Sequence, residues 1–369
     1  MRILIVHPVM VFLGGGENLC CATIRTLLSC GHEITVLSEA FDPQKVESHF
    51  GYDGLFDKVN LLSYPPNDKA PELGSCSHLI RHLRGQKHAL RQIKHLRSRA
   101  FDLVLSTQDE GYIPDMNLSV IQWGYFPRSF PNYFPSSLPK TIRSLPLRLH
   151  YERKISRIGL VLAISRYSKW HFDKEWKRPS VVVYPSCNMV KPRAKRNLVV
   201  TAARAVPGKR LELFWKVARL RPEYEFMMLL TQDPRLVEYS ISLSKESPSN
   251  GRTIFNASKE TYHKFLGEAK VYIHLMEEER FGITIVEAMS ASCVPIVHDS
   301  GASKEIVDSE AGFLWQKIVD VPRMIDEAMK ESPSAAARRR AENFNNERFE
   351  KRLSSVFSEL QARNPRLTQ

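Results

Sequence analysis

Residues 2–38 read RILIVHPVMVFLGGGENLCCATIRTLLSCGHEITVLS. Two apolar runs in this segment, Arg2–Val6 and Glu33–Ser38, are β-branched and too short to favour a helix. Between them, Gly14–Gly16 precede an apolar-periodic stretch from about Glu17 to Cys30, which Gly31 ends. Strand, loop, helix and strand in this order predict a right-handed βαβ unit of a parallel sheet.

The same alternation continues along the rest of the chain. Further strands are expected at residues 102–106, 119–122, 160–164, 198–202, 225–230, 253–255, 271–275, 294–297 and 312–314, and helices at 78–99, 211–220 and 343–360. Between Pro185 and Lys195 the composition turns to Pro, Lys, Arg and Asn, which marks a domain boundary. We therefore expect an α/β fold of two doubly wound Rossmann-like domains facing a central cleft.

Composition sets limits on the class of protein. The chain has 369 residues, 43% of them hydrophobic, which is enough for two cores. Its net charge of +13 fits an anionic membrane surface, a nucleic acid, a polyphosphate ligand or simply a well-solvated basic protein. The six cysteines form no CxxC pair, which favours a reducing compartment. We see neither a signal peptide nor an apolar run of about 20 residues, so we expect no membrane span.

The most informative stretch is ERFGITIVEAM, residues 279–289, followed by CVPIV at 293–297. It reads as a loop that ends in Phe281-Gly282 and enters a helix at Ile283-Thr284, where free N–H groups can hold a phosphate. Gly282 lets the backbone approach a ligand closely. The carboxylates of Glu279 and Glu287 can each accept two hydrogen bonds from a vicinal diol, which suits a sugar or a ribose. The alternative is that both are ordinary surface glutamates of an amphipathic helix.

This stretch resembles the donor site of family 4 of the retaining glycosyltransferases, which have the GT-B fold. The resemblance covers most of the chain, and the middle of the N-terminal half matches more loosely. A second motif, Ala203-Arg204-Ala-Val-Pro-Gly-Lys209, is similar to the family's G-R-x-x-x-x-K segment, with Ala203 in place of the glycine. The resemblance implies that Arg204 and Lys209 neutralise the donor diphosphate, which a phosphate leaving group requires. It also implies that Glu279 acts on the transferred sugar and Glu287 on the ribose, so the catalytic residues would be Arg204, Lys209 and Glu279. A solvated basic loop is the alternative for Arg204 and Lys209.

In the N-terminal half, Gly14-Gly15-Gly16-Glu17 resembles the family's GG-x-E loop, which places Gly15 and Gly16 against the donor. A tight strand–helix turn explains the same glycines. GxGxxG and GxxxxGK[ST] are absent, which argues against a dinucleotide oxidoreductase and a P-loop kinase. Tyr125, in Gln122-Trp-Gly-Tyr-Phe-Pro127, stands where many relatives have a histidine. We expect it on the acceptor side, but a tyrosine is a poor base at neutral pH.

The resemblance also assigns roles to the domains. Residues 1–188 would form the acceptor-side domain, 189–342 the nucleotide-sugar-binding domain, and 343–369 a helix that crosses back to the N-terminal domain. It implies transfer with retention of anomeric configuration, without a protein nucleophile and without a metal, so no cofactor is expected. We assign His7, His32 and His298 structural or peripheral roles.

The basic charge gathers in the half expected to bind the acceptor. No acidic residue occurs between Ser75 and Phe101, and leucines recur there at helical spacing. Seven cations lie in this interval, namely Arg81, Arg84, Lys87, Arg91, Lys94, Arg97 and Arg99, and a second basic cluster comprises Lys140, Arg143, Arg148, Arg153, Lys154 and Arg157. A basic amphipathic helix predicts docking on anionic lipid through Arg84, Arg91 and Lys94. The alternative is a helix whose leucines lie in the core and whose cations lie in water.

The expected partners are therefore a nucleotide-diphosphate sugar and a lipid-linked acceptor, with the protein peripheral on the cytoplasmic face of a membrane. A loose likeness to mannosyltransferases of lipid-linked oligosaccharides favours GDP-mannose, and a UDP-sugar stays possible. A glycosyltransferase with a soluble polysaccharide or metabolite acceptor is the alternative. A nucleic-acid-binding protein is a remote one, since no helix-turn-helix, zinc-finger or RNP-like motif occurs.

Overall fold

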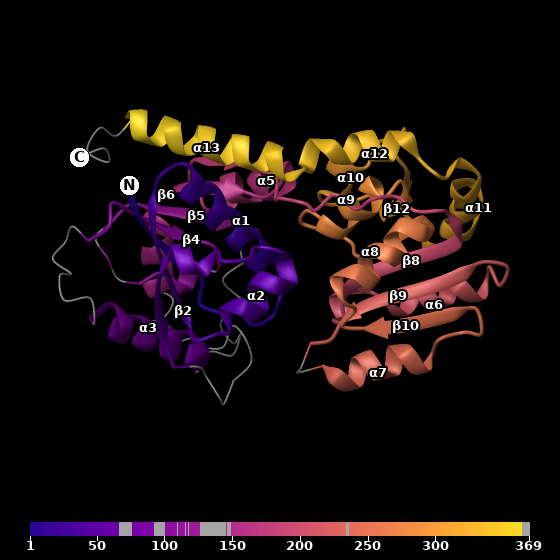
Figure 1. The fold of residues 1–369 in the computed structure, drawn as a ribbon, viewed down its shortest axis with the longest axis horizontal. Helices are drawn as coiled ribbons and strands as arrows, with labels where there is room; N and C mark the ends of the chain where they lie inside the picture. Colours follow the sequence, from indigo (N-terminus) through magenta and orange to yellow (C-terminus); the bar gives the residue numbers. More distant parts are fainter. Residues whose placement is uncertain are drawn as a thin grey trace. The chain divides into compact units, whose positions relative to one another are not determined.

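The computed structural model describes residues 1–65, 76–91, 100–108, 110–114, 116, 118–125, 145, 149–233 and 236–363. The chain divides into two compact units: unit 1 is Met1–Val183 together with the chain from Glu350 on, and unit 2 is Tyr184–Phe349. Each unit is built on one parallel sheet with helices packed against it (Figure 1). The predicted α/β class with two parallel-sheet domains is therefore confirmed. The cleft that we expected between the domains stays a prediction.

Unit 1 contains a seven-stranded sheet in the order β3-β2-β1-β4-β5-β6-β7, with every neighbouring pair parallel. Its strands are β1 (Arg2–Val6), β2 (Glu33–Glu39), β3 (Asn60–Tyr64), β4 (Leu103–Ser106), β5 (Val120–Gly124), β6 (Ile158–Ala163) and β7 (Ser180–Val182). Its helices include α1 (Gly15–Ser29), α2 (Pro43–Phe50), α3 (Cys76–Arg91) and α5 (Arg166–Glu175). The order of the strands reverses direction between β1 and β4, so a topological switch point lies at their carboxyl ends.

The strands of unit 1 are apolar because helices cover both faces of the sheet. In β1, Leu4 and Val6 belong to a core that includes Leu90 of α3 and Phe172 of α5. Side chains alternate across a strand, so Ile3 and its neighbour Ile5 point to the opposite face, and both are fully buried. A buried strand of this kind reads as a continuous apolar run, which is why the sequence identified it.

Unit 2 contains a six-stranded parallel sheet in the order β10-β9-β8-β11-β12-β13. Its strands are β8 (Arg196–Arg204), β9 (Glu225–Thr231), β10 (Gly251–Phe255), β11 (Ala269–His274), β12 (Val294–His298) and β13 (Phe313–Trp315). Its helices are α6 (Glu212–Arg219), α7 (Val237–Lys245), α8 (Lys259–Glu268), α9 (Ile283–Ser290), α10 (Ser303–Ile306), α11 (Val321–Glu331) and α12 (Ala335–Ala341), and α13 (Asn346–Arg363) begins here. The strand order again reverses once, between β8 and β11.

Several elements differ from the sequence prediction. The structure adds the strands β3 and β7 and the helices α2, α5, α8, α10, α11 and α12, and it starts the long basic helix at Cys76 instead of residue 78. Residues 92–99 and most of the proline-dense segment 127–146 lie outside the described part of the chain. Strand β8 is longer than the predicted 198–202 because its ladder with β9 continues to the pair Arg204 and Thr231. Arg204 is therefore the last residue of a strand and does not lie in the loop that follows.

The C-terminal helix α13 packs on unit 1 from Glu350 on. The guanidinium of Arg25 in α1 donates to the carboxylate of Glu350 at 2.7 Å. Phe357 is buried, and its ring centroid lies 6.1 Å from that of His32. Across the described ranges, we find no helix with the length and apolarity that a membrane crossing requires.

Candidate functional site

The polar residues of unit 2 gather where its parallel strands end. Arg204 is the last residue of β8 and His274 is the last residue of β11, and these two strands are neighbours in the sheet. All six strands run in the same direction, so their carboxyl ends form one edge. The strand order reverses between β8 and β11, and open α/β sheets bind their ligands at this point. The sheet itself therefore marks the place where the sequence motifs meet.

Three charged or titratable side chains meet at this edge around one carboxylate oxygen. Lys209 ends a single 3-10 turn after β8, and Glu279 lies in the loop between β11 and α9. The ammonium group of Lys209 donates to Oε2 of Glu279 at 2.7 Å, and Nε2 of His274 lies 2.8 Å from the same oxygen. Burial raises the pKa of Glu279, but Lys209 and His274 outweigh burial and hold the pKa well below its ordinary value. Glu279 is therefore ionised at neutral pH although its side chain is nearly buried.

Close backbone packing fixes the loop that carries Glu279. The N–H of Glu278 donates to the hydroxyl of Ser300 at 2.7 Å, and the N–H of Ala302 donates to the carbonyl of Glu279 at 2.7 Å. Between these two contacts, Gly301 has a φ of +62°, and a Cβ there would lie 2.4 Å from the carbonyl oxygen of Glu279. Only glycine allows this approach. The segment Gly301-Ala-Ser, which follows β12 in the chain, therefore holds the backbone of Glu279 in place.

Helix α9 begins directly after this loop, with Gly282 as its N-cap at a φ of 98°. Residues with a Cβ rarely adopt this φ, so the backbone conformation itself requires glycine; a Cβ there would also lie 2.5 Å from Cδ1 of Ile285. The N–H groups of Ile283 and Thr284 lie in the first turn, where helices hold anions. Phe281 packs between the rings of Tyr184 and Phe344, so only its backbone is placed to face a ligand.

Glu287 lies in the second turn of α9 and is also buried. The hydroxyl of Tyr262, on α8, donates to its Oε2 at 2.6 Å. Burial raises the pKa of Glu287 to about 7, although the Tyr262 hydrogen bond acts in the opposite direction. The two glutamates of the motif therefore differ: Glu279 is fixed as an anion, while Glu287 changes its charge near neutral pH.

The structure thus brings together in unit 2 most of the predicted donor-site residues, with Lys209 and Glu279 in direct contact. Sequence reasoning missed His274 and Tyr262. His274 had a usable sign, because it lies in the predicted strand 271–275, five residues before Glu279. Tyr262 had none, because α8 lies distant in sequence and only the tertiary fold brings its hydroxyl to Glu287.

The predicted glycine loop of unit 1 lies at the other switch point. Gly15 and Gly16 start α1, and Oε2 of Glu17 accepts from the N–H of Gly14 at 2.8 Å, which caps the helix. A Cβ on Gly16 would meet the hydroxyl of Tyr125 at 3.5 Å, an ordinary contact, so the protein's own packing does not require glycine there.

Tyr125 itself is tied to the strand next to it. Its hydroxyl donates to the carbonyl of Thr107 at 3.0 Å, and the hydroxyl of Thr107 lies 2.8 Å from Nδ1 of His7. Burial raises the pKa of Tyr125 well above 10, so this hydroxyl does not act as a base. Tyr125 is thus a neutral hydrogen-bonding group.

Helix α3 carries the predicted membrane residues. Arg84 and Arg91 are exposed, and Lys94 lies outside the described residues. The leucines Leu79 and Leu90 are buried in unit 1 together with His82. The apolar stripe therefore faces the core, and the outward face of the helix is cationic.

In the second basic cluster Lys154 is fully buried, which corrects its assignment to a surface cluster. Lys140, Arg143 and Arg148 lie outside the described residues.

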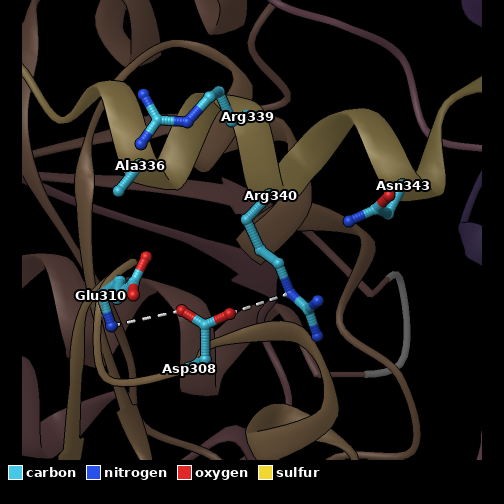
Figure 2. Close-up of a pocket in the computed structure, with 6 residues that line it drawn as sticks. All are labelled: Asp308, Glu310, Ala336, Arg339, Arg340 and Asn343. Carbon is cyan, nitrogen blue, oxygen red and sulfur yellow. Dashed lines mark hydrogen bonds and ion pairs between the residues drawn. The ribbon is translucent and has the colours of Figure 1, made fainter.

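A pocket of about 190 Å³ lies elsewhere on unit 2, lined by Asp308, Glu310, Ala336, Arg339, Arg340 and Asn343 (Figure 2). The guanidinium of Arg340 donates to the carbonyls of Glu305 and Ile306 at the end of α10, and it lies 3.4 Å from the carboxylate of Asp308. These contacts give Arg340 a structural role. None of the predicted site residues lines this pocket.

Over the described residues, no group of three or more His, Cys, Asp or Glu side chains is placed to hold a metal. The expectation that the protein needs no metal stays a prediction.

The chain resembles known proteins in both sequence and fold. Residues 189–343 match the family model of the glycosyl transferases group 1. A GDP-Man:Man(3)GlcNAc(2)-PP-Dol alpha-1,2-mannosyltransferase from Dictyostelium discoideum is 34% identical over 97 residues, which are 25% of this chain and 19% of that protein. The enzyme of the same name from Xenopus tropicalis is 34% identical over 98 residues, which are 24% of this chain and 20% of that protein. The matched segment thus spans about a fifth of each relative.

Solved structures resemble the whole chain. Sucrose-phosphate synthase from Thermosynechococcus elongatus has a TM-score of 0.75 at 14% identity, covering 99% of this chain and all of that one. HepE from Anabaena, solved in complex with UDP and glucose, has a TM-score of 0.70 at 15% identity, covering 97% of this chain and all of that one.

Two parallel-sheet units with this strand order define the class: the protein has the GT-B fold. Within it, residues 189–343, which carry the cluster around Glu279, are the part of the chain that matches the glycosyl transferases group 1 model.

Proposed function

We propose that this protein is a retaining glycosyltransferase that moves a hexose from a nucleotide-diphosphate sugar, with GDP-mannose as the favoured donor. The observation that carries the proposal is the cluster at the carboxyl edge of the unit 2 sheet, where Lys209 and Glu279 make a partly buried ion pair beside the glycine-capped start of α9. The names of the curated relatives support GDP-mannose. The UDP in the HepE complex keeps a UDP-sugar as the second candidate.

Each residue then has a role that follows from its chemistry. Arg204 and Lys209 offset the negative charge that grows on the leaving diphosphate, which is a large term in transfer reactions of this kind. The N–H groups of Ile283 and Thr284 at the start of α9 bind a phosphate oxygen. Ionised Glu279 accepts hydrogen bonds from hydroxyls of the transferred sugar. Glu287 accepts hydrogen bonds from the ribose diol, and ligand binding favours its ionised form.

The proposed reaction needs no nucleophile from the protein. The acceptor hydroxyl attacks the anomeric carbon on the face that the diphosphate leaves, and a donor phosphate oxygen takes the proton of that hydroxyl. The protein positions both substrates and stabilises the leaving group. Gly15 and Gly16 against the donor, Tyr125 on the acceptor side and closure of the two domains around the substrates belong to the proposal through the family resemblance.

For the acceptor, we propose a lipid-linked molecule reached from the cytoplasmic face of a membrane. The cationic outward face of α3 supports this, because Arg81, Arg84, Lys87 and Arg91 are all exposed and no acidic residue lies on that helix. A soluble polysaccharide or metabolite acceptor is the second candidate, since Leu79 and Leu90 of α3 lie in the core and the outward face of the helix is mainly cationic. The names of the curated relatives favour the lipid-linked acceptor.

The deciding experiment is a calorimetric titration of the purified chain with GDP, UDP and ADP, and with a single-stranded oligonucleotide as the rival ligand. We expect one nucleoside diphosphate to bind, and we expect Glu287→Ala to weaken that binding by about 10- to 100-fold, since a hydrogen bond to a charged group contributes about 1.5–3 kcal/mol. Wild-type protein that binds the oligonucleotide and none of the diphosphates would overturn the proposal. Affinity unchanged in Glu287→Ala would remove that residue from the site.

A further inference from the structure

His274 belongs to the cluster but to none of the motifs. Its imidazole lies 2.8 Å from Oε2 of Glu279 and is 4% exposed. The ring stacks on Tyr272 at a centroid distance of 6.4 Å, and the backbone carbonyl of His274 accepts from the indole of Trp315 at 3.4 Å. Because it ends a buried strand and its ring stacks on a neighbour, the side chain has little freedom to turn. Glu279 therefore has one rigid partner.

The direction of the hydrogen bond follows from the charge of Glu279. An ionised carboxylate only accepts hydrogen bonds, so Nε2 of His274 carries a proton and donates the hydrogen bond to Glu279. Burial lowers the pKa of His274, and the contact with Glu279 offsets this only in part, so the ring is neutral at pH 7. A neutral imidazole with its proton on Nε2 thus shares the oxygen with Lys209.

Lys209 differs from His274 in mobility and in the number of partners it must serve. Its flexible side chain is 24% exposed and extends from a short turn. In the structure it donates to Glu279, yet the proposed function requires its charge at the diphosphate. When Lys209 moves to the diphosphate, Oε2 of a nearly buried carboxylate loses a donor, and a buried charge without partners is strongly disfavoured. The hydrogen bond from the N–H of Arg280, at 2.9 Å, does not compensate for this loss, because it reaches the other oxygen, Oε1.

We infer that His274 is a positioning residue that keeps Oε2 of Glu279 hydrogen-bonded when Lys209 leaves it for the donor diphosphate. The ammonium group can then move between two anions while Glu279 stays ionised and aimed at the sugar. This inference rests on the proposed function for the role of Lys209 with the donor. The support that His274 gives to Glu279 needs no ligand and is testable separately.

The first test uses Lys209→Ala in ligand-free protein as a mimic of the departed lysine. The whole chain is unfolded in urea at pH 7, and the unfolding of unit 2 is monitored by hydrogen exchange of β11 and α9. The proteins compared are wild type, Lys209→Ala, His274→Phe and the double variant. We expect Lys209→Ala to change the unfolding equilibrium at least tenfold more in the His274→Phe background than in wild type, because only there is Oε2 left without a donor. His274→Gln, which retains a donor N–H, should restore the wild-type response. Additive effects would overturn the inference.

The second test uses the nucleoside diphosphate that binds wild type best among GDP, UDP and ADP. With His274→Phe we expect weaker binding of this diphosphate, and a kcat at least tenfold lower with the corresponding nucleotide sugar. Among the described residues, Lys209 is then the one side chain that still donates to Glu279, and it is retained there. His274→Gln should recover both, and His263→Gln, a half-buried histidine on α8, serves as the matched control. In a Lys209→Ala background the effect of His274→Phe on diphosphate affinity should vanish, and an equal loss in both backgrounds would overturn the inference. Absence of binding to any of the three by wild type would instead contradict the proposed function, and the unfolding cycle would still decide the support of Glu279 by His274.

Discussion

The two glutamates of the motif lie eight positions apart in the chain, yet their surroundings give them opposite electrostatic properties. Glu279 accepts from a cation and a histidine, which hold its pKa well below the ordinary value although burial raises it. For Glu287, burial outweighs both the hydrogen bond from the neutral hydroxyl of Tyr262 and the charge of Lys259, so its pKa rises to about 7. The difference means that one glutamate is ready as an anion, while the other becomes an anion when a ligand with hydroxyl donors arrives.

This raised pKa predicts a pH-dependent stability. A folded-state pKa of about 7 against 4.5 for the ordinary side chain means that the folded protein binds the proton more tightly. The stabilisation is fully present below pH 4.5 and is lost as the pH rises through 7, by about 3 kcal/mol in all. Glu287→Gln removes the titration and keeps an acceptor for Tyr262. We expect its free energy of unfolding relative to wild type to increase by roughly this amount between pH 5 and pH 8 in urea titrations. A difference that does not change with pH would show that Glu287 is already ionised in the free protein.

For Arg204 and Lys209 we expect substitutions to affect turnover rather than folding. Arg204→Ala and Lys209→Ala should each lower kcat by about 10²–10³-fold, the loss that follows removal of one group that stabilises a developing anion. Thermal unfolding should change little for Lys209→Ala, because His274 still donates to Glu279. Lys209→Met controls for the aliphatic stem, and Lys209→Arg should recover part of the rate. Wild-type kcat in both alanine variants, with a donor that the protein turns over, would remove these residues from the diphosphate.

Sequence reasoning reached the residues that carry charge and missed those that support them. Arg204, Lys209, Glu279 and Glu287 were predictable because each belongs to a local motif with its own chemistry. The contact of Tyr262 with Glu287 joins α8 to α9, and no pattern within either helix encodes it. The two glutamates look alike in the sequence, and only the neighbours supplied by the fold make their pKa values differ.

At the scale of elements, the apolar strands at the centre of each sheet were predictable. The edge strands β10 and β13 of unit 2 were predicted as well, at 253–255 and 312–314, but the edge strands β3 and β7 of unit 1 were not. β1 is a run of fully buried residues, whereas β3 at the edge of the sheet reads NLLSY and is only partly buried. α5 is short and polar, and its start is marked by Ser165, whose side chain accepts from the N–H of Ser168. Helices and strands of this kind take their stability from neighbours, so hydrophobic periodicity gives only a weak indication of them.

Helix α3 leads to a prediction about charge alone. With Leu79 and Leu90 in the core, attraction to lipid depends on its exposed cations, each of which contributes about 1 kcal/mol near an anionic surface and less at high salt. We expect wild type to float with anionic liposomes at low salt and to be released at high salt. Arg84→Glu with Arg91→Glu should reduce the bound fraction at least tenfold, and Lys94→Glu should reduce it further.

The matched control for this helix is Lys45→Glu with Lys58→Glu, which reverses two exposed charges elsewhere in unit 1. The control should still float, and transfer to a short water-soluble acceptor should survive in both variants. Wild type that ignores anionic liposomes at low salt would favour the soluble acceptor.

At the scale of the whole molecule, each unit has its own core. Unit 2 is filled by residues of β8 to β13 with α6 and α11, and the core of unit 1 extends over α3 and α5. Helix α13 is counted with unit 2 up to Phe349 and with unit 1 from Glu350 on. The last part of the chain therefore contributes to the stability of the first part. The charged cluster around Glu279 is formed by residues of unit 2 alone.

This division predicts that folding of unit 1 and nucleotide binding by unit 2 respond to different substitutions. Phe357 is 1% exposed in unit 1, so Phe357→Ala should destabilise that unit by about 3–5 kcal/mol. Hydrogen exchange should then rise in α1 and β2, while the affinity for the nucleoside diphosphate stays within about twofold, because the proposed donor residues Arg204, Lys209, Glu279 and Glu287 all belong to unit 2.

Phe226→Ala is the matched variant in the core of unit 2, and it should reverse the pattern by raising exchange in β8 and β9. Nucleoside diphosphate at about 100 times its Kd should restore about 2.7 kcal/mol to Phe226→Ala and far less to Phe357→Ala, since a ligand stabilises the unit that binds it. If Phe357→Ala instead abolished nucleotide binding while unit 2 kept its slow exchange, the donor site would need residues of unit 1 in place, and Gly15 and Gly16 would be the first to substitute.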